Sequence, residues 1–232
     1  MRVFLSLLLV FGFTYAQEVY ATFSVEAKQS ASLAFIVSGV VDKVNVDIGD
    51  VVKQDAVLAQ LKNDDTSALL EGAKTTYKYA KKDYERQVKV KKLIDEGKFD
   101  SFANKYESAK NQLAYQQATY DKTILKAPFD GVIFAKNIEV GDAVNGMMLK
   151  TVFQIQSQSA RKLVLEFDQK YNNVVKVGQT FTYSVDGDKK TYTGTISKVY
   201  PHADTKTRKV QAEVEVKNFT VGLFGEGNIE IK

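Results

Sequence analysis

The chain of 232 residues has no cysteine, no tryptophan, one histidine and two prolines. It therefore forms no disulfide. His202 and the neighbouring pair Met147 and Met148 are too few ligands for a zinc or copper site. No phosphate-binding loop or nucleophile-elbow motif occurs. We therefore expect neither an enzyme nor a bound cofactor, and a structure held together by core packing or assembly.

The chain also has no strong excess of positive or negative charge. Basic and acidic residues number 32 and 28, for a formal net charge of +4, and they are spread along the chain. No nucleic-acid partner is expected from this distribution. The lysine-rich run from Lys81 to Lys92 is interrupted by Asp83 and Glu85, which favours a solvated helix face over an anion site.

The first 16 residues read as a secretory signal peptide. Arg2 precedes a mostly apolar run from Val3 to Phe13, and Ala16 is the small residue that signal peptidase accepts. The run is shorter than the roughly 20 residues that span a bilayer as a helix. We expect cleavage before Gln17, with retention as an anchor as the alternative.

A short phrase occurs twice. The segment Gly39 to Val52 reads GVVDKVNVDIGDVV, and Gly131 to Val144, 92 positions later, reads GVIFAKNIEVGDAV. Each copy predicts a hairpin of two short strands around a Gly-Asp turn that begins at Gly49 or Gly141. Gly39 and Gly131 stand where a side chain would obstruct close packing. Because neither hairpin buries a face alone, the copies are predicted to pack as a pseudo-two-fold sandwich.

The segment between the copies, from Asp64 to Lys122, is predicted to be helical. Candidate seam residues recur at spacings of three and four: Leu70, Ala73, Tyr77, Ala80, Tyr84 and Val88, then Phe102, Tyr106, Ala109, Leu113, Gln116 and Tyr120. Gly97 suits the end of the first helix, and Asp100 or Ser101 the start of the second. The segment predicts a projecting antiparallel hairpin whose first arm is about ten residues longer than the second. Pro128 is expected to begin the returning strand.

This layout resembles the lipoyl fold split by a helical hairpin in periplasmic adaptor proteins, also called membrane fusion proteins, of the HlyD and RND efflux type. The resemblance lies in Ser38 to Leu61 and in Thr123 to Val144, above all in the run Ala127 to Gly131. Farther on, a group of residues resembles the β-barrel domain of the family: Pro201, Asp204, Thr207 and Arg208. The expected fold is mainly β, with a split lipoyl-like sandwich, an inserted coiled-coil hairpin and a β-barrel.

The predicted boundaries are a signal peptide at 1–16, an N-terminal strand and first half-motif at 17–61, the hairpin at 62–122, the second half-motif at 123–157 and the barrel at 158–232. The resemblance implies a periplasmic adaptor that self-associates into a ring. It would link an inner-membrane RND-type transporter to an outer-membrane TolC-like channel for export of drugs or other small molecules. An ABC exporter as the inner-membrane partner remains open. A lipoyl or biotin carrier would need a modifiable lysine in the turn that the helical insertion replaces.

The family's channel-docking pattern is an arginine, a leucine four residues later and a serine after the turn. In this chain Lys89, Leu93 and Ser101 stand at similar places, with one extra residue before the serine. Lysine lacks the guanidinium fork, so Arg86 is a substitute candidate, and Gly97 completes the predicted tip. Leu93 also fits an ordinary heptad position.

Overall fold

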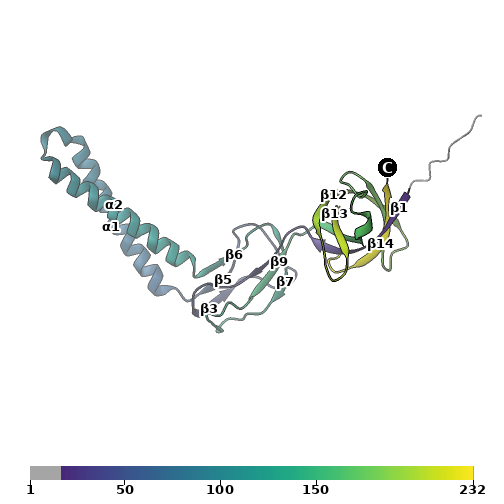
Figure 1. The fold of residues 1–232 in the computed structure, drawn as a ribbon. Coiled ribbons are helices and arrows are strands. Elements are labelled where there is room, and N and C mark those ends of the chain that lie inside the picture. The colour runs from purple at the N-terminus through teal and green to yellow at the C-terminus, as the bar shows by residue number, and fades with distance from the viewer. Residues whose placement is uncertain (1–16, 232) are drawn as a thin grey trace, which may run out of the picture. The chain divides into compact units, whose positions relative to one another are not determined.

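The computed structural model describes residues 17–231, and the chain divides into two compact units (Figure 1). One unit takes its residues from both ends of the chain, up to Lys28 and from Ser159 onward; the other spans Gln29–Gln158. The predicted signal peptide at 1–16 lies outside the described residues. No helix in the described range is long and apolar enough to cross a membrane.

The first unit is a closed barrel of six antiparallel strands in the order β1-β10-β13-β12-β11-β14. The strands are β1 (Gln17–Ala27), β10 (Ala160–Asp168), β11 (Thr180–Val185), β12 (Thr191–Ala203), β13 (Lys209–Lys217) and β14 (Phe224–Ile231), with a short 3₁₀ helix η2 (Gln169–Tyr171) after β10. The predicted boundary at 158 was wrong in leaving out β1, which pairs with both β10 and β14 and closes the barrel.

Alternation of apolar residues fills the barrel. Along β1, the side chains of Val19, Ala21, Phe23 and Val25 are buried at every second position. The ring of Phe23 meets the ring of Phe181 edge-on, with centroids 5.9 Å apart. These inward-facing side chains form a single core between the six strands.

The outer surface of the barrel carries a charge cluster centred on Glu213 of β13. Its carboxylate accepts hydrogen bonds from the Lys162 ammonium at 2.7 Å and the Tyr200 hydroxyl at 2.7 Å. Lys162 also pairs with Glu26 at 3.7 Å, and Lys198 pairs with Glu213 at 3.5 Å. The cluster therefore ties together β1, β10, β12 and β13.

The second unit contains a sandwich of two four-stranded sheets, in the orders β2-β9-β7-β4 and β6-β5-β3-β8. The strands are β2 (Ser30–Leu33), β3 (Gly39–Val44), β4 (Val51–Val52), β5 (Val57–Leu61), β6 (Ile124–Lys126), β7 (Gly131–Lys136), β8 (Ala143–Val144) and β9 (Phe153–Gln156). Each half of the repeat was predicted to form its own hairpin, and this was wrong. Instead β3 pairs with β8 and β4 pairs with β7, so each copy divides its two strands between the sheets.

Reciprocal hydrogen bonds join the two copies. The Gly49 amide donates to the Ile133 carbonyl at 2.8 Å, and the Gly141 amide, 92 positions later, donates to the Val41 carbonyl at 2.9 Å. Both glycines have a φ of 95°, in the left-handed region that L side chains rarely adopt. The repeat thus encodes two equivalent turns, each bonded to the other copy.

Gly131 has a packing role. A Cβ at this position would lie 2.5 Å from the Gln156 carbonyl oxygen and 2.8 Å from a side-chain carbon of Ile155. Gly39 is less restricted, with the Leu61 side chain 3.1 Å from such an atom. Pro128 does not begin the returning strand as predicted. The chain is already extended in β6, and Pro128 lies in the connection to β7.

The hairpin is inserted between β5 and β6 and consists of α1 (Asp64–Lys89), the 3₁₀ turn η1 (Lys91–Leu93) and α2 (Glu96–Asp121). The two arms are equal at 26 residues, so the predicted difference in length was wrong. Leu70, Ala73 and Ala109 are buried in the seam as predicted. Val88 is 47 % exposed and lies outside it.

Candidate docking surface at the hairpin tip

Aromatic side chains fix the outer half of the hairpin. The Tyr84 ring stacks on the Tyr106 ring, with centroids 5.0 Å apart, and also contacts the Phe99 ring at 5.8 Å. Tyr77 continues the row against Tyr106 at 5.7 Å. Phe99 is buried, although its position was absent from the predicted heptad list. The arms are thus held together by ring contacts close to the turn.

The turn itself is short and hydrogen-bonded. The Val90 amide donates to the Gln87 carbonyl at 3.1 Å and ends α1, and the Leu93 amide donates to the Val90 carbonyl at 2.8 Å. Ile94 is extended, and the Asp95 carboxylate then caps α2 by accepting from the Lys98 amide at 3.0 Å. The chain therefore reverses between Val90 and Asp95.

Two predicted helix boundaries were wrong for this reason. Gly97 does not end the first helix but is the second residue of α2, and Ser101 lies inside α2 rather than at its start. Asp95 is the capping residue. The sequence signal for this cap was the acidic pair Asp95-Glu96 before a helical run. Gly97 obscured that signal, because glycine more often follows a helix than opens one.

Leu93 is the most exposed apolar residue of the turn. Its side chain is 85 % exposed, although burial of a side chain as large and apolar as leucine is favourable. Val90 beside it is 38 % exposed. An ordinary heptad residue would face the other arm, so Leu93 does not serve the seam that joins α1 and α2.

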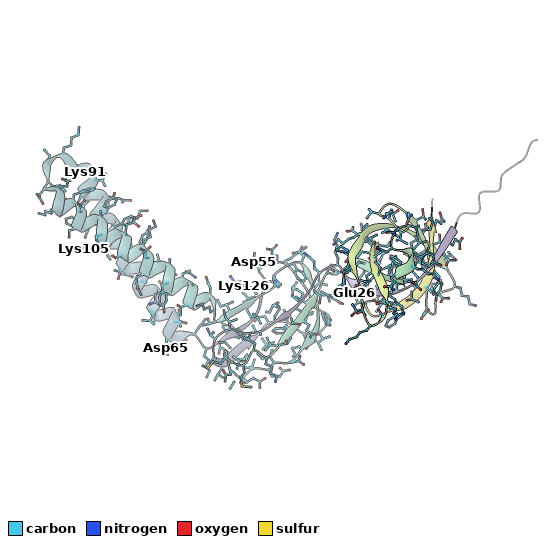
Figure 2. All side chains as sticks on the ribbon, in the orientation of Figure 1. Glu26, Asp55, Asp65, Lys91, Lys105 and Lys126 are labelled. Carbon is cyan, nitrogen blue, oxygen red and sulfur yellow. The ribbon has the colours of Figure 1, made fainter. Side chains whose placement is uncertain are left out.

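Positive charge surrounds this apolar residue. Lys89, Lys91 and Lys92 flank the turn, and the ammonium of Lys91 lies over the Phe99 ring, 4.6 Å from its centroid. Figure 2 shows Lys91 at the free end of the hairpin. Two lysines of the turn, Lys91 and Lys92, were not among the predicted site residues. Their signal was the Lys-Val-Lys-Lys run before Leu93, which we assigned to a solvated helix face.

The five predicted tip residues do not converge on one point. Lys89 ends α1 and Leu93 ends η1, so these two lie at the turn. Gly97 is exposed in the first turn of α2, and Ser101 is five residues into α2, about 8 Å along the helix axis. Arg86 lies one turn below the end of α1, where its guanidinium pairs with the Asp83 carboxylate. The tip is therefore a surface spread over the end of both arms.

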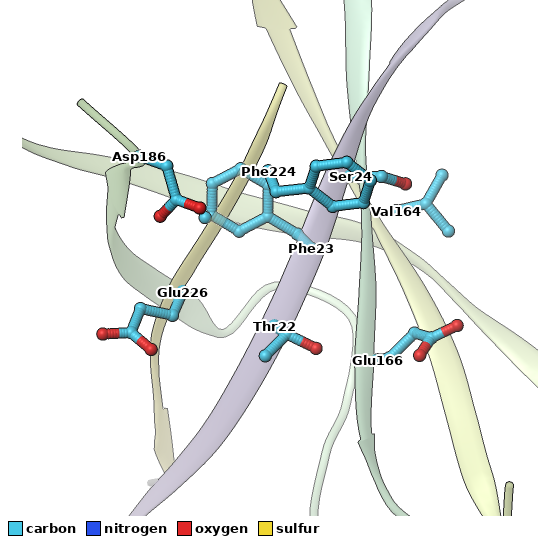
Figure 3. A pocket seen from close by; sticks show the side chains of 9 residues that line it. Thr22, Phe23, Ser24, Val164, Glu166, Asp186, Phe224 and Glu226 are labelled. Atoms are coloured by element: carbon cyan, nitrogen blue, oxygen red, sulfur yellow. The ribbon is translucent and has the colours of Figure 1, made fainter. Parts of the chain in front are cut away.

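The barrel has a hollow of its own, shown in Figure 3, with a volume of about 310 Å³. Carboxylates of Glu166, Asp186 and Glu226 border it, together with the exposed ring of Phe224. Two of the carboxylates are already engaged. Glu166 accepts from Lys209 at 3.1 Å, and Glu226 accepts from the Tyr20 hydroxyl at 2.6 Å, a hydrogen bond that raises the pKa of Tyr20.

Comparison with known protein families agrees with this architecture. Residues 29–156 match the family of CzcB-like barrel-sandwich hybrid domains, and residues 163–225 match CusB-like β-barrel domains. The two matched segments cover the sandwich with its hairpin and most of the barrel. The chain belongs to the membrane fusion proteins, the periplasmic adaptor family of efflux pumps. The resemblance and the fold class expected from the sequence are thereby confirmed.

Individual relatives are distant. An uncharacterized protein of Haemophilus influenzae is 23 % identical over 192 residues, which cover 82 % of this chain and 50 % of that protein, so the chain spans about half the length of the curated relative it matches. A MacA-MexA chimera containing the Pseudomonas aeruginosa MexA α-hairpin domain aligns over 94 % of this chain and 80 % of its own, with a TM-score of 0.81 and 22 % identity. The membrane fusion protein Spr0693 of Streptococcus pneumoniae aligns over 92 % and 99 %, with a TM-score of 0.71 and 15 % identity. These structures share the fold.

Proposed function

We propose that the protein is the periplasmic adaptor subunit of a tripartite efflux pump. It links an inner-membrane transporter of the RND type to an outer-membrane TolC-like channel, and copies of it assemble into a ring. In this role the protein performs no chemistry and exports drugs or other small molecules through its partners. The predicted signal peptide would deliver it to the periplasm.

The observation that carries this proposal is the exposed Leu93 at the end of a stiffened hairpin. An apolar side chain that is 85 % exposed at the turn is available to a partner, while the ring contacts of Tyr84 hold both arms in place behind it. A rigid surface of this kind loses little conformational freedom on binding. The hairpin therefore suits the role of the element that reaches the channel.

The charge of the tip indicates the chemistry of the channel surface. Lys89, Lys91 and Lys92 surround Leu93, so the complementary surface would offer a small apolar pocket with acidic residues at its rim. Contacts of this size are weak singly. A ring of adaptors would multiply them, because the tips engage the channel together.

The identity of the inner-membrane partner can be tested by co-purification with the tagged protein. The protein, tagged at its C-terminus, is purified from mildly cross-linked envelopes, and the co-purifying membrane proteins are identified by mass spectrometry. An RND transporter and an outer-membrane channel together support the proposal. Recovery of an ABC exporter in place of the RND transporter would show that the proposed RND partner is wrong. The absence of any transporter would contradict an adaptor role.

A further inference from the structure

The strand register brings several chain segments to one end of the barrel. β1 begins there with Gln17, which is paired with Ile231 at the end of β14 (Figure 1). Because Thr22 of β1 is paired with Glu166 of antiparallel β10, β10 finishes at the end where β1 begins. The loop after β10 and the turn between β12 and β13 therefore lie there too. We call this the entry end, because the chain enters the barrel at this point.

Two connections at the entry end carry positive charge. Lys170 and Lys176 belong to the loop after β10, and Lys206 and Arg208 to the turn between β12 and β13. All four residues are exposed. Lys170 lies 4.0 Å from the Asp168 carboxylate, and in residues 17–231 no ion pair involves the other three. Their charges are therefore available to a partner outside the chain.

The carboxylates near these cations do not cancel them. Those of Asp168 and Asp204 accept hydrogen bonds from backbone amides of their own turns, at 2.9 and 2.8 Å. Glu18 and Glu230 stand opposite each other on β1 and β14, in the wall of the barrel. In the two connections the cations thus outnumber the carboxylates.

The loop after β10 also presents apolar side chains in a fixed conformation. Val174 and Val177 are 37 % and 62 % exposed, whereas Val175 between them is buried in the barrel core. The buried side-chain amide of Gln179 accepts from the Lys176 amide at 2.8 Å and donates to the Val174 carbonyl at 2.9 Å. The loop therefore holds two valines outward beside the lysines.

A polar hollow of about 480 Å³ lies between this loop and β12. Lys170 and His202 border it, together with the side chains of Asn172 and Asn173. Ammonium and amide groups donate hydrogen bonds to phosphate oxygens. Basic groups around a few protruding apolar side chains are typical of surfaces that lie on anionic bilayers.

We propose that the entry end of the barrel binds directly to the surface of a bilayer that contains anionic phospholipids. The cations and the polar hollow would meet the headgroup phosphates, and Val174 and Val177 would reach the boundary of the acyl chains. The position of the N-terminus supports this orientation, because the mostly apolar run from Val3 to Phe13 precedes β1 and joins the barrel at this end. The contact goes beyond the proposed function, since it involves lipid and neither a transporter nor a channel.

The number of cations sets the strength of the contact. Each lysine or arginine near an anionic surface raises the affinity about fivefold, so the four together give a preference of several hundredfold over a neutral surface. Salt screens this attraction over a distance of about 8 Å at physiological ionic strength. The contact is therefore reversible and weakens as the salt concentration rises.

Co-sedimentation with vesicles tests the charge of the entry end. The chain without residues 1–16 is used, so that the apolar run makes no contribution. One set of vesicles contains equal parts of phosphatidylglycerol and phosphatidylcholine, and the other contains phosphatidylcholine alone. Lys176→Gln with Lys206→Gln should weaken binding to the anionic vesicles about 25-fold. The matched control is Lys189→Gln with Lys190→Gln, in the exposed turn between β11 and β12 at the opposite end, and should leave binding unchanged.

The lack of tryptophan permits a second measurement, of insertion. Val177→Trp places a single tryptophan at the entry end, and its fluorescence should shift to shorter wavelength when anionic vesicles are added. Phe224→Trp, at an equally exposed position near the opposite end of the barrel, should show no shift. Circular dichroism checks that every variant keeps its fold.

Three results would overturn the proposal. Equal binding to both kinds of vesicle, or equal losses in the two double variants, would show that the entry end does not recognise anionic lipid. Displacement from vesicles by inorganic phosphate, but not by chloride at the same ionic strength, would make the hollow a site for free phosphate. Failure to bind vesicles by a protein that still co-purifies with a transporter would reject the lipid contact and leave the adaptor role intact.

Discussion

The ring of Tyr84 on α1 lies parallel to the ring of Tyr106 on α2, with their planes 4° apart and their centroids 5.0 Å apart. This stack joins the arms shortly before the turn that presents Leu93. Stacked aromatic pairs add about 0.5–1.5 kcal/mol beyond the area they bury. A hairpin that projects from its sandwich has few other contacts to hold its outer half together, so this stack matters more here than within a bundle.

Tyr84→Ala should destabilise the outer half of the hairpin by about 2 kcal/mol, roughly half of the cost at a fully buried aromatic residue. The measurement is native-state amide hydrogen exchange along both arms. Faster exchange should be confined to residues near the turn, with the barrel unchanged. Tyr115→Ala is the control, since Tyr115 is 65 % exposed and contacts no ring in the described part of the chain. Equal effects from both variants would contradict a special role of the stack.

Heptad spacing alone located most of this seam but not its end. Leu70, Ala73 and Ala109 could be predicted because small and apolar residues recur at spacings of three and four over several turns. Near the turn the pattern was ambiguous. Val88 fitted the spacing but is exposed, while Phe99 was missed because the glycine at 97 suggested a loop there. Capping by a single aspartate at residue 95 decided the boundary, and such local hydrogen bonds leave little trace in periodicity.

Gly131→Ala should destabilise the sandwich by about 1–3 kcal/mol, because the added Cβ would lie 2.5 Å from the Gln156 carbonyl oxygen and the backbone must move. Gly72→Ala makes the same chemical change in α1, where, apart from the neighbouring residues and the helix's own backbone, nothing lies within 4 Å of the added Cβ. There it should stabilise the helix by about 0.8–1 kcal/mol. Urea denaturation of both variants measures the free energy of unfolding, which should fall for Gly131→Ala and rise for Gly72→Ala. Destabilisation by both would show that the close approach at Gly131 is not the cause.

The hairpin should be removable without unfolding the sandwich. The strands that flank it are already joined, since the Leu61 amide donates to the Thr123 carbonyl at 2.9 Å and Asn63 bonds the Thr123 hydroxyl at 3.1 Å. A Gly-Ser-Gly linker in place of Asp64–Asp121 therefore closes a short gap at a small entropic cost. Thermal denaturation should still show cooperative unfolding. If cooperativity were lost, the hairpin would belong to the core.

The barrel should lose stability in acid through Glu213. Burial acts to raise the pKa of this carboxyl, but hydrogen bonds from Lys162 and Tyr200 and the nearby lysine charges outweigh it and lower the pKa from an ordinary 4.5 to about 2. Because the folded-state pKa is the lower one, the stabilisation is present above pH 4.5 and is lost as the pH falls towards about 2.

Glu213→Gln should therefore lower stability at neutral pH and flatten its dependence on pH in that acidic interval. Chemical denaturation at a series of pH values measures both effects. Glu215→Gln is the control, because Glu215 is 62 % exposed and forms a solvent-accessible pair with Lys28. An unchanged pH profile in Glu213→Gln would show that other carboxylates govern the acid response of the barrel.

The sequence repeat predicted the sandwich but not the exchange of strands within it. Two Gly-Asp phrases at one spacing indicate two equivalent turns, and Gly49 and Gly141 do share a φ of 95°. Which strand pairs with which depends on contacts between residues far apart in the chain, such as that between Gly49 and Ile133. Local pattern cannot distinguish a hairpin from two strands that each pair with the other copy. The exposure of Leu93 at the tip was harder still to predict from the sequence, because it depends on where the hairpin turns.

Docking of the hairpin tip on an outer-membrane channel can be tested by cross-linking in cells from position 93. A photo-reactive amino acid at position 93 reports which protein touches the tip, and Leu93→Asp or Ser101→Arg should then restore drug sensitivity. Charge at a closely packed contact loses apolar burial and adds a desolvation cost, whereas abundance and helicity should not change. Lys82→Glu, in the arm and away from the turn, should be tolerated. We expect a cross-link from position 93 to an outer-membrane channel. Cross-links only to other copies of the adaptor, with normal efflux in the tip variants, would show that the tip does not dock on a channel.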